Sequence, residues 1–369
     1  MTWNWQHRNW PNFEWDRTEF KKLDQQFYLL VGEAIGSIKY LSQEDLSQLR
    51  VELLLNEVMN TSEIEGELLD RDSVQSSLRK AFGLQANRSP VSPVEAGVVE
   101  MMLDVYANFQ QTLSHQSLWD WHAMLMNGRR DLLSIGAYRN HDDSMQIISG
   151  PIGRRRVHFE APPSARVSEE MDQFVNWYNS ALTDSELTPL ERASLSHLYF
   201  ESIHPFEDGN GRIGRALVEK SLSQSIGDPI LLALSKRIFE AKKEYYQALH
   251  HNSTGLEISN WMSFFSKTIL ESLRFAQRHI EFIIKKAQFL DKYKHDLNER
   301  QLKCVMRMFE AGPEGFVGGL SAKNYRTITK TTAATATRDL TQLVIIKAFH
   351  KSGELKGTRY FFNLDQVNI

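Results

Sequence analysis

The stretch richest in reactive side chains is residues 204–215, HPFEDGNGRIGR, which contains a histidine, two acids, three glycines and two arginines. Gly209, Asn210 and Gly211 can adopt the positive-φ conformations that turn successive backbone N–H groups toward one point. Such a concavity at the start of a helix binds phosphate, because the helix N-terminus adds positive potential. The stretch therefore predicts a phosphate-binding loop.

The charged side chains around this loop fit the same chemistry. Arg212 and Arg215 are three positions apart on the expected helix, so they share one face, and guanidinium groups suit phosphate oxygens. Asp208 is out of place beside them unless a hard cation needs it, and Mg²⁺ held by one carboxylate plus substrate phosphates fits. His204 is a candidate general base, because an imidazole titrates near neutral pH.

Two other motif matches in this stretch fail on their context. Residues 209–214 fit G-x-G-x-x-G, the dinucleotide fingerprint, but they follow a polar His-Pro segment instead of a buried strand. Asp208, Asn210 and Glu219 fit positions 1, 3 and 12 of a calcium loop. An isoleucine stands at position 6 of that loop, where glycine is required, and an arginine at position 5. We therefore exclude both interpretations.

The elements that must position the loop are mostly helical. The 369 residues include only 10 prolines and 20 glycines, and long stretches are rich in good helix formers. Between Gly136 and Pro163, two β-prone runs flank a Gly-Pro-Ile-Gly turn, which predicts a β-hairpin inside the helical body. We expect helices at residues 44–60, 95–113, 165–182, 188–203, 213–226, 257–283 and 284–297. Gly227 ends the helix at 213–226.

Composition and charge narrow the class of protein. The net charge is −3, from 43 basic and 46 acidic side chains, so any nucleic-acid contact must come from a local patch. Cys304 is the only cysteine, which excludes an intrachain disulfide and a cysteine-rich zinc site. The first residues lack the features of a signal peptide, and the longest aliphatic run, 230–234, is too short to span a membrane. We expect a cytoplasmic protein without membrane contact.

The chain changes character from Asn298 onward. The expected order is helix–turn–helix and then a two-stranded hairpin turned at Ser352-Gly353, which is the winged-helix pattern. Residues 321–369 carry eight basic and three acidic side chains, a local charge of +5. This predicts either a DNA-binding module with its recognition helix at 331–342, or a module for protein contact or dimerisation.

The dodecamer closely resembles the signature HPF-x-(D/E)-GNGR-x-x-R of the Fic family, protein adenylyltransferases that transfer AMP from ATP to a hydroxyl side chain. Every fixed position of the signature is met. The hairpin at 145–157 is similar to the family's flap, and the helices over 95–265 to its body. The resemblance implies a mainly α fold, a Fic-type helical bundle with a β-hairpin flap, plus a small C-terminal winged-helix domain. It implies an N-terminal aromatic-rich segment with an inhibitory helix over 1–94, a catalytic core over 95–297 and a winged-helix-like domain over 298–369.

The resemblance also implies a role for each matching residue. His204 would take the proton of a target Tyr, Thr or Ser hydroxyl, and Asp208 would hold Mg²⁺. Arg212 would bind the β-phosphate and Arg215 the γ-phosphate. The rest of the ATP site would be formed by Gly209, Asn210, Gly211, Ile213 and Gly214 in the loop and helix, by Ile147, Ile148, Ser149 and Gly150 in the flap, and by Tyr245, Tyr246 and Asn252 near adenine and ribose. A pair of tyrosines within a helix is also typical of the hydrophobic core, without a binding role.

A second segment matches the family's inhibitory pattern, (S/T)-x-x-x-E-(G/N), with Thr61, Glu65 and Gly66 at the fixed positions. Taken alone, the hexamer also fits an ordinary helix end, with Gly66 following the last turn. A carboxylate paired with Arg215 would take its guanidinium away from the γ-phosphate, and a misaligned α-phosphate would slow transfer. The resemblance therefore implies autoinhibition by Glu65.

Together these residues predict a magnesium-dependent protein adenylyltransferase that uses ATP to modify itself and target proteins bound at the flap. Three alternatives stay open. They are removal of AMP from a modified protein, transfer of another phosphate-containing group at the same site, and a nucleotide-sensing regulator that binds DNA through its C-terminal module. The family resemblance also suggests a homodimer.

Overall fold

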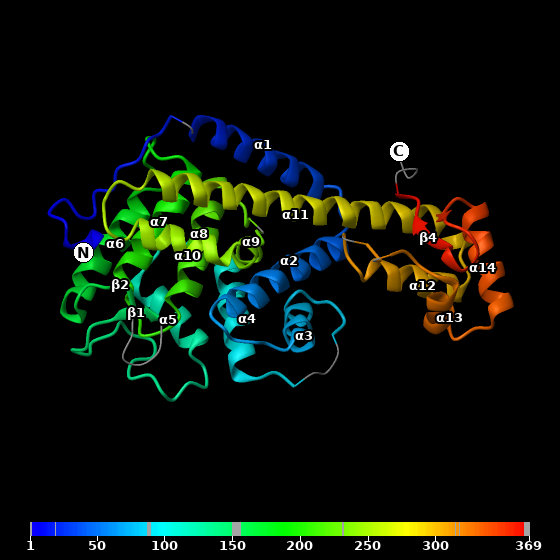
Figure 1. Ribbon diagram of the computed structural model, residues 1–369, viewed down its shortest axis with the longest axis horizontal. Coiled ribbons are helices and arrows are strands. Elements are labelled where there is room, and N and C mark those ends of the chain that lie inside the picture. Colours follow the sequence, from blue (N-terminus) through cyan, green and yellow to red (C-terminus); the bar gives the residue numbers. More distant parts are fainter. Residues whose placement is uncertain are drawn as a thin grey trace. The chain divides into compact units, whose positions relative to one another are not determined.

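The protein is described here by a computed structural model over residues 2–18, 20–86, 90–149, 156–230, 232–313, 315–316 and 318–364. These residues are mostly helical, as predicted, and none of the helices among them is long and apolar enough to cross a membrane. The α-helices (Figure 1) are α1 Phe20–Ile38, α2 Gln43–Ile64, α3 Arg71–Ala81, α4 Pro93–Ala107, α5 His115–Leu125, α6 Ser164–Ser180, α7 Pro189–Ile203, α8 Asn210–Ile226, α9 Leu234–Glu240, α10 Lys242–His251, α11 Ser259–Tyr293, α12 Glu299–Phe309, α13 Ala322–Thr329 and α14 Ala333–Ile345. The strands are β1 Gln146–Ser149, β2 Arg156–Glu160, β3 Phe349–Ser352 and β4 Arg359–Phe362.

The chain divides into two compact units. Unit 1 comprises Met1–Glu33 and Arg50–Ala276, and unit 2 comprises Ala34–Leu49 and Gln277–Ile369. Helices α1, α2 and α11 contribute residues to both units. The domain boundaries expected from the sequence stay predictions.

Helices α7 and α8 lie side by side in unit 1 (Figure 1) and carry the loop with the dodecamer between them. Helix α6 packs on α7, while α4 and α5 pack on α8. Helix α7 starts with a capping box, in which Thr188 and Glu191 each accept the other's backbone N–H, and with Pro189 in its first turn. Because almost every residue of α7 is buried, the position of the loop is fixed by packing.

The loop itself is closed by two left-handed residues. His204 ends α7 with φ 51°, and Gly209 precedes α8 with φ 83°. The side chain of Asn210 braces the loop, since its Oδ1 accepts the Phe206 N–H (2.9 Å) and its Nδ2 donates to the Phe206 carbonyl (2.8 Å). The expected positive φ is thus found at Gly209. At Asn210 and Gly211 the expectation is wrong, because α8 begins at Asn210, earlier than the predicted residue 213, and both residues are helical.

Strands β1 and β2 form the β-hairpin that the sequence predicts inside the helical body. They pair antiparallel, with Gln146 opposite Glu160 and Ile147 opposite Phe159. Gly150 and the rest of the predicted Gly-Pro-Ile-Gly turn lie outside the described residues, as does the side chain of Ser149.

The aromatic N-terminal segment packs against this hairpin and α7. The Trp3 ring meets the Phe159 ring edge-on, with centroids 5.5 Å apart. Trp5 Nε1 donates to the Glu160 carbonyl (2.7 Å). Between them, Asn4 Nδ2 donates to Ser202 Oγ of α7 (2.6 Å). Residues 3–5 therefore tie the hairpin to α7.

One helix prediction is wrong. The two helices expected at 257–283 and 284–297 are a single helix, α11. Its sequence contains neither glycine nor proline, so no residue interrupts the backbone hydrogen-bond pattern. Helix α4 is also shorter than predicted, ending at Ala107 with Asn108 as its C-cap.

Unit 2 contains helices α12 to α14 packed against one another, with α14 also packed against β3. Asp339 of α14 joins the three helices, because its Oδ2 accepts hydrogen bonds from Tyr325 Oη (3.0 Å) and Arg300 Nε (2.9 Å). Strands β3 and β4 pair antiparallel. The order of elements is the one expected, and the assignment to the winged-helix class stays a prediction.

The close approach of α4 and α5 at Gly97 generates a prediction about stability. A Cβ at Gly97 would lie 1.8 Å from the Met124 carbonyl oxygen. We expect Gly97→Ala to lower the free energy of unfolding by about 1–3 kcal/mol, the usual cost of overpacking, in urea denaturation. Gly32→Ala in α1 is the control, because no atom lies within 4 Å of that Cβ and alanine favours helix. Equal urea midpoints of unfolding for Gly97→Ala and Gly32→Ala would contradict the close packing of α4 on α5.

Candidate functional site

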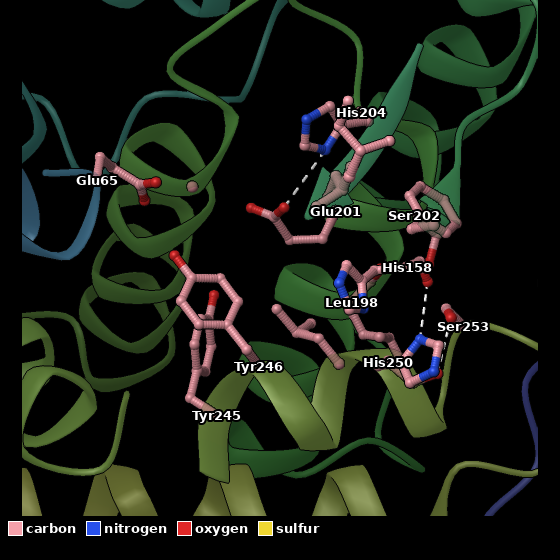
Figure 2. Close-up of a pocket in the computed structure, with 15 residues that line it drawn as sticks. Glu65, His158, Leu198, Glu201, Ser202, His204, Tyr245, Tyr246, His250 and Ser253 are labelled. Carbon is pink, nitrogen blue, oxygen red and sulfur yellow. Dashed lines mark hydrogen bonds and ion pairs between the residues drawn. The ribbon is translucent and has the colours of Figure 1, made fainter. Parts of the chain in front are cut away.

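A cavity of about 520 Å³ lies beside the start of α8 (Figure 2). Many of its lining residues come from the β1–β2 hairpin, α7 and α10, and the lining comprises Glu65, Ile147, Ile148, His158, Phe159, Leu198, Glu201, Ser202, His204, Gly211, Tyr245, Tyr246, Leu249, His250 and Ser253. Seven residues predicted from the sequence are therefore brought together, namely Glu65, Ile147, Ile148, His204, Gly211, Tyr245 and Tyr246.

Among the predicted residues that do not line the cavity, three are occupied with local packing. Asn252 ends α10, where its Nδ2 donates to the Ala248 carbonyl (2.8 Å). Ile213 is fully buried in the hydrophobic core. Gly214 faces α7, since a Cβ there would lie 2.8 Å from Glu201 Oε1. Their assignment to the ATP site followed the family pattern and stays a prediction.

The His204 backbone is held by Arg139, a residue that sequence reasoning missed. Arg139 Nε donates to the His204 carbonyl (2.9 Å), and its Nη2 donates to the Pro162 carbonyl (2.6 Å). Its own backbone N–H donates to the Pro205 carbonyl (2.9 Å). Burial lowers the pKa of Arg139 to about 10, so the guanidinium stays charged at neutral pH. Arg139 therefore secures the left-handed turn that presents the imidazole.

The guanidinium of Arg215 is buried and bound by the end of α2 and the turn after it. Its Nε donates to Thr61 Oγ1 (2.9 Å), and its Nη2 donates to the Thr61 carbonyl (3.0 Å) and to Glu65 Oε1 (2.8 Å). Burial by itself would lower the pKa of Arg215, but the charge of Glu65 outweighs it and raises that pKa above its ordinary value. Its Nη1 has no hydrogen-bond partner, so one buried donor is left for an anion.

Two glycines make the contact between Glu65 and Arg215 possible. Gly66 has φ 85° and ends the turn that presents Glu65, in agreement with the expected helix end. Gly211 leaves room for the carboxylate, because a Cβ there would lie 2.3 Å from Glu65 Oε1. Any other residue at position 211 would therefore displace Glu65.

Arg212 meets a second carboxylate from the same turn. Its Nη1 donates to Glu67 Oε2 (2.5 Å), and the Arg212 side chain is 1% exposed. Its Nε has no hydrogen-bond partner. Sequence reasoning missed Glu67, because the inhibitory pattern ends before it. Two arginines on α8 are thus paired with two glutamates that follow α2.

Asp208 is an ionised carboxylate at the end of the loop, directly before Gly209. Its Oδ2 pairs with Arg129 Nη1 (2.7 Å), and its Oδ1 accepts the Gly209 N–H (2.6 Å). Burial raises the pKa of Asp208, but Arg129 and Arg212 outweigh it and hold that pKa below its usual value. Across the described part of the chain, no group of three or more His, Cys, Asp or Glu side chains could hold a metal ion. A divalent cation at Asp208 would therefore need oxygen ligands from a substrate.

Glu65 is shared between the cavity and Arg215. Its side chain lines the cavity, and its Oε1 accepts a hydrogen bond from Nη2 of Arg215, whose side chain is 1% exposed. An anionic group that binds Nη2 must therefore displace the Glu65 carboxylate. The arrangement can bind a phosphate chain at α8 and place a hydroxyl group beside His204.

Comparisons with known proteins agree with this geometry. Residues 112–222 match the Fic/DOC family, and residues 3–84 match a domain of unknown function, DUF4172. A Caenorhabditis elegans protein named protein adenylyltransferase fic-1 is 35% identical over 202 residues, which cover 54% of this chain and 36% of that protein. The chain thus spans only about a third of the length of this curated relative.

Solved structures share the fold. A Fic family protein from Desulfovibrio desulfuricans is 21% identical, with a TM-score of 0.53, over 92% of this chain and 96% of that one. A Fic domain containing signaling protein from Bacteroides thetaiotaomicron is 24% identical, with a TM-score of 0.52, over 69% of this chain and 98% of that one. The family resemblance and the mainly α fold expected from the sequence are confirmed.

Proposed function

Because residues 112–222 form a Fic/DOC family domain, we propose that the chain is a protein adenylyltransferase, which moves AMP from ATP to a hydroxyl group of a protein. One observation carries the proposal. His204 and Gly211, at the start of α8, border a single cavity whose volume of about 520 Å³ suits a nucleotide. Glu65, which accepts a hydrogen bond from the buried Arg215, lines the same cavity. The name of the fic-1 relative supports the same activity.

The proposed step is an in-line displacement at the α-phosphorus. The hydroxyl oxygen of the target attacks that phosphorus while His204 takes the hydroxyl proton. The bond between the α-phosphorus and the bridging oxygen breaks, and pyrophosphate leaves. Arg212 would contact the β-phosphate and Arg215 the γ-phosphate, so charge that develops on the leaving group is stabilised by fixed cations.

Asp208 would hold Mg²⁺ together with phosphate oxygens, and the cation would neutralise phosphate charge when bound. The carboxylate fits this task because it is ionised and partly exposed. Its ion pair with Arg129 would have to loosen for the cation to bind. The backbone N–H groups at residues 209–211 would face the phosphates at the start of α8.

The remaining cavity walls would bind the nucleoside and the target. Tyr245 is buried, while Tyr246 is partly exposed, and both line the cavity opposite the hairpin. Ile147 and Ile148 of β1 are exposed and border the same space. The free edge of the hairpin would accept the target by strand addition, in which backbone hydrogen bonds supply affinity with little sequence specificity.

Glu65 would act as a built-in inhibitor of this reaction. Its carboxylate already occupies the guanidinium that the γ-phosphate needs. Glu67 engages Arg212 in the same way. While both contacts hold, ATP would bind with its α-phosphorus off the line of attack, and transfer would be slow.

The first prediction about this function concerns transfer from labelled ATP. Purified wild type, Glu65→Gly and His204→Ala are each given Mg²⁺ and ATP that is labelled on the α- or the γ-phosphate. We expect protein-bound label from α-labelled ATP alone. The Glu65→Gly variant should incorporate at least about tenfold more than wild type, since a small misalignment costs ~10² in rate, and His204→Ala should incorporate none.

Each other outcome contradicts part of the proposal. Label from the γ-phosphate would indicate a kinase-like enzyme. Equal α-label in wild type and Glu65→Gly would exclude Glu65 as the inhibitor. No label from either position would favour AMP removal or another donor at the same site.

The second prediction concerns Glu67. In Glu65→Gly, adding Glu67→Gln should raise AMP transfer by a further few-fold, because Arg212 is then free for the β-phosphate. Glu67→Gln alone should change little, because Glu65 still holds Arg215. Asp72→Asn removes an exposed carboxylate of α3 and is the control. An identical rate in Glu65→Gly with and without Glu67→Gln would show that the Glu67 contact does not restrain the reaction.

We also propose a second function, DNA binding by unit 2. Four basic side chains on α13, α14 and the turn between them are exposed, namely Lys323, Arg326, Lys330 and Arg338. The local charge of +5 over residues 321–369 suits contact with phosphates of a duplex.

The third prediction tests this second function with the full chain. Its affinity for duplex DNA should fall steeply as salt rises, because cations are released from the DNA on binding. Replacing Arg338 and Lys330 by alanine should weaken binding and reduce the salt slope by about 1 for each phosphate that the variant no longer neutralises. Binding that is absent, or that salt does not change, would exclude the DNA-binding function.

A further inference from the structure

Helix α7 places three titratable side chains on one face, ending at His204. His197, Glu201 and His204 are spaced four and three residues apart, so they lie on successive turns. Figure 2 shows the Glu201 side chain pointing toward the His204 ring, and Glu201 Oε2 lies 3.5 Å from His204 Nδ1. Sequence reasoning did not single out Glu201, although this spacing from His204 was visible in the chain.

Packing leaves the Glu201 carboxylate little freedom. Its side chain is 11% exposed, and its Oε1 is buried without a hydrogen-bond partner. A Cβ on Gly214 of α8 would lie 2.8 Å from that oxygen and 3.0 Å from the His197 ring. The His197 ring is itself fixed, because its Nε2 lies 2.7 Å from Tyr245 Oη. Helix α8 therefore closes over the carboxylate and holds it beside His204.

The carboxylate is charged in this environment. Burial raises the pKa of Glu201, but His204, His197 and Arg215 together outweigh burial and lower that pKa below its ordinary value. A fixed negative charge next to an imidazole favours a proton on the nearer ring nitrogen. In a neutral imidazole, the hydrogen bond made by one nitrogen decides which nitrogen carries the proton.

His204 Nδ1 has no hydrogen-bond partner, and 3.5 Å is longer than a hydrogen bond. Contacts of this kind tighten when substrate binds. We propose that Glu201 is a positioning residue, which accepts the Nδ1–H of His204 and so leaves Nε2 unprotonated and directed at the target hydroxyl. The inference rests on the proposed function, in which His204 is the general base.

Several charged or titratable groups face Glu201 and must stay constant in any test. They are His197 and His204 from α7, Arg215 from α8, and Tyr245 from α10. Glu65 and Tyr246 interact electrostatically with members of this cluster, namely His197, Arg215 and Tyr245. Variants at Glu201 leave all of them in place.

The kinetic test uses AMP transfer in the Glu65→Gly background. Glu201→Gln keeps an oxygen that can accept Nδ1–H but removes the charge. We expect it to retain most of kcat. Glu201→Ala lacks both the accepting oxygen and the charge. We expect its kcat to fall at least about tenfold, which is part of the roughly 10²–10⁴-fold acceleration that general base catalysis supplies. The KM for ATP should change little. Glu169→Gln, an exposed carboxylate of α6, is the control and should match the parent.

A second readout needs no reaction. Long-range ¹H–¹⁵N NMR reports which ring nitrogen is protonated, and the His204 signals among the 12 histidines are those missing from His204→Ala. We expect the Nδ1–H tautomer in wild type and Glu201→Gln, and a shift toward Nε2–H in Glu201→Ala. The same tautomer in wild type and Glu201→Ala would overturn the inference, as would unchanged kcat in Glu201→Ala. A tautomer change in a chain that transfers no AMP would instead reject the proposed function and leave the contact between Glu201 and His204 standing.

Discussion

The buried guanidinium of Arg215 is the charge around which the site is organised. A cation removed from water must be paired, because leaving it alone costs several kcal/mol. Thr61 and Glu65 supply that pairing here, and in the proposed enzyme the γ-phosphate would supply it instead. In that proposal, the same physical need stabilises the fold without nucleotide and would provide the binding site with it. Competition between two anions for one guanidinium would then be sufficient for Glu65 to act as an inhibitor.

The glycines of the dodecamer serve packing, beside the phosphate binding proposed for them. Gly211 leaves space for the Glu65 carboxylate, and Gly214 lets α8 approach Glu201 and His197 on α7. Of the three glycines, only Gly209 has a positive φ, 83°. The spacing of these glycines therefore sets how closely Glu65, α8 and the end of α7 approach one another. The N-terminal residues 3–5 add a further support, because they contact Phe159 and Ser202 in the cavity wall.

Local patterns in the sequence predicted the hairpin and the helices at the positions of α2, α4, α6, α7 and α8, but not α1, α3, α5, α9 or α10. The family patterns singled out the two segments that meet at Arg215. Both kinds of pattern failed where a contact joins distant segments. Arg139 and Arg129 bind the loop from about seventy residues away in the chain, and a lone arginine carries no local signal of its partner. Glu67 lies just beyond the inhibitory pattern. The division of α11 into two helices was wrong because no glycine or proline supports a break.

The central claim is that Glu65 and the γ-phosphate compete for Arg215. Calorimetric binding of ATP and ADP to wild type and Glu65→Gly tests it directly, because only ATP carries the γ-phosphate. We predict that Glu65→Gly tightens ATP binding at least about tenfold, equivalent to 1.4 kcal/mol, and leaves ADP binding nearly unchanged. An equal change for both nucleotides, or none for ATP, would contradict the claim.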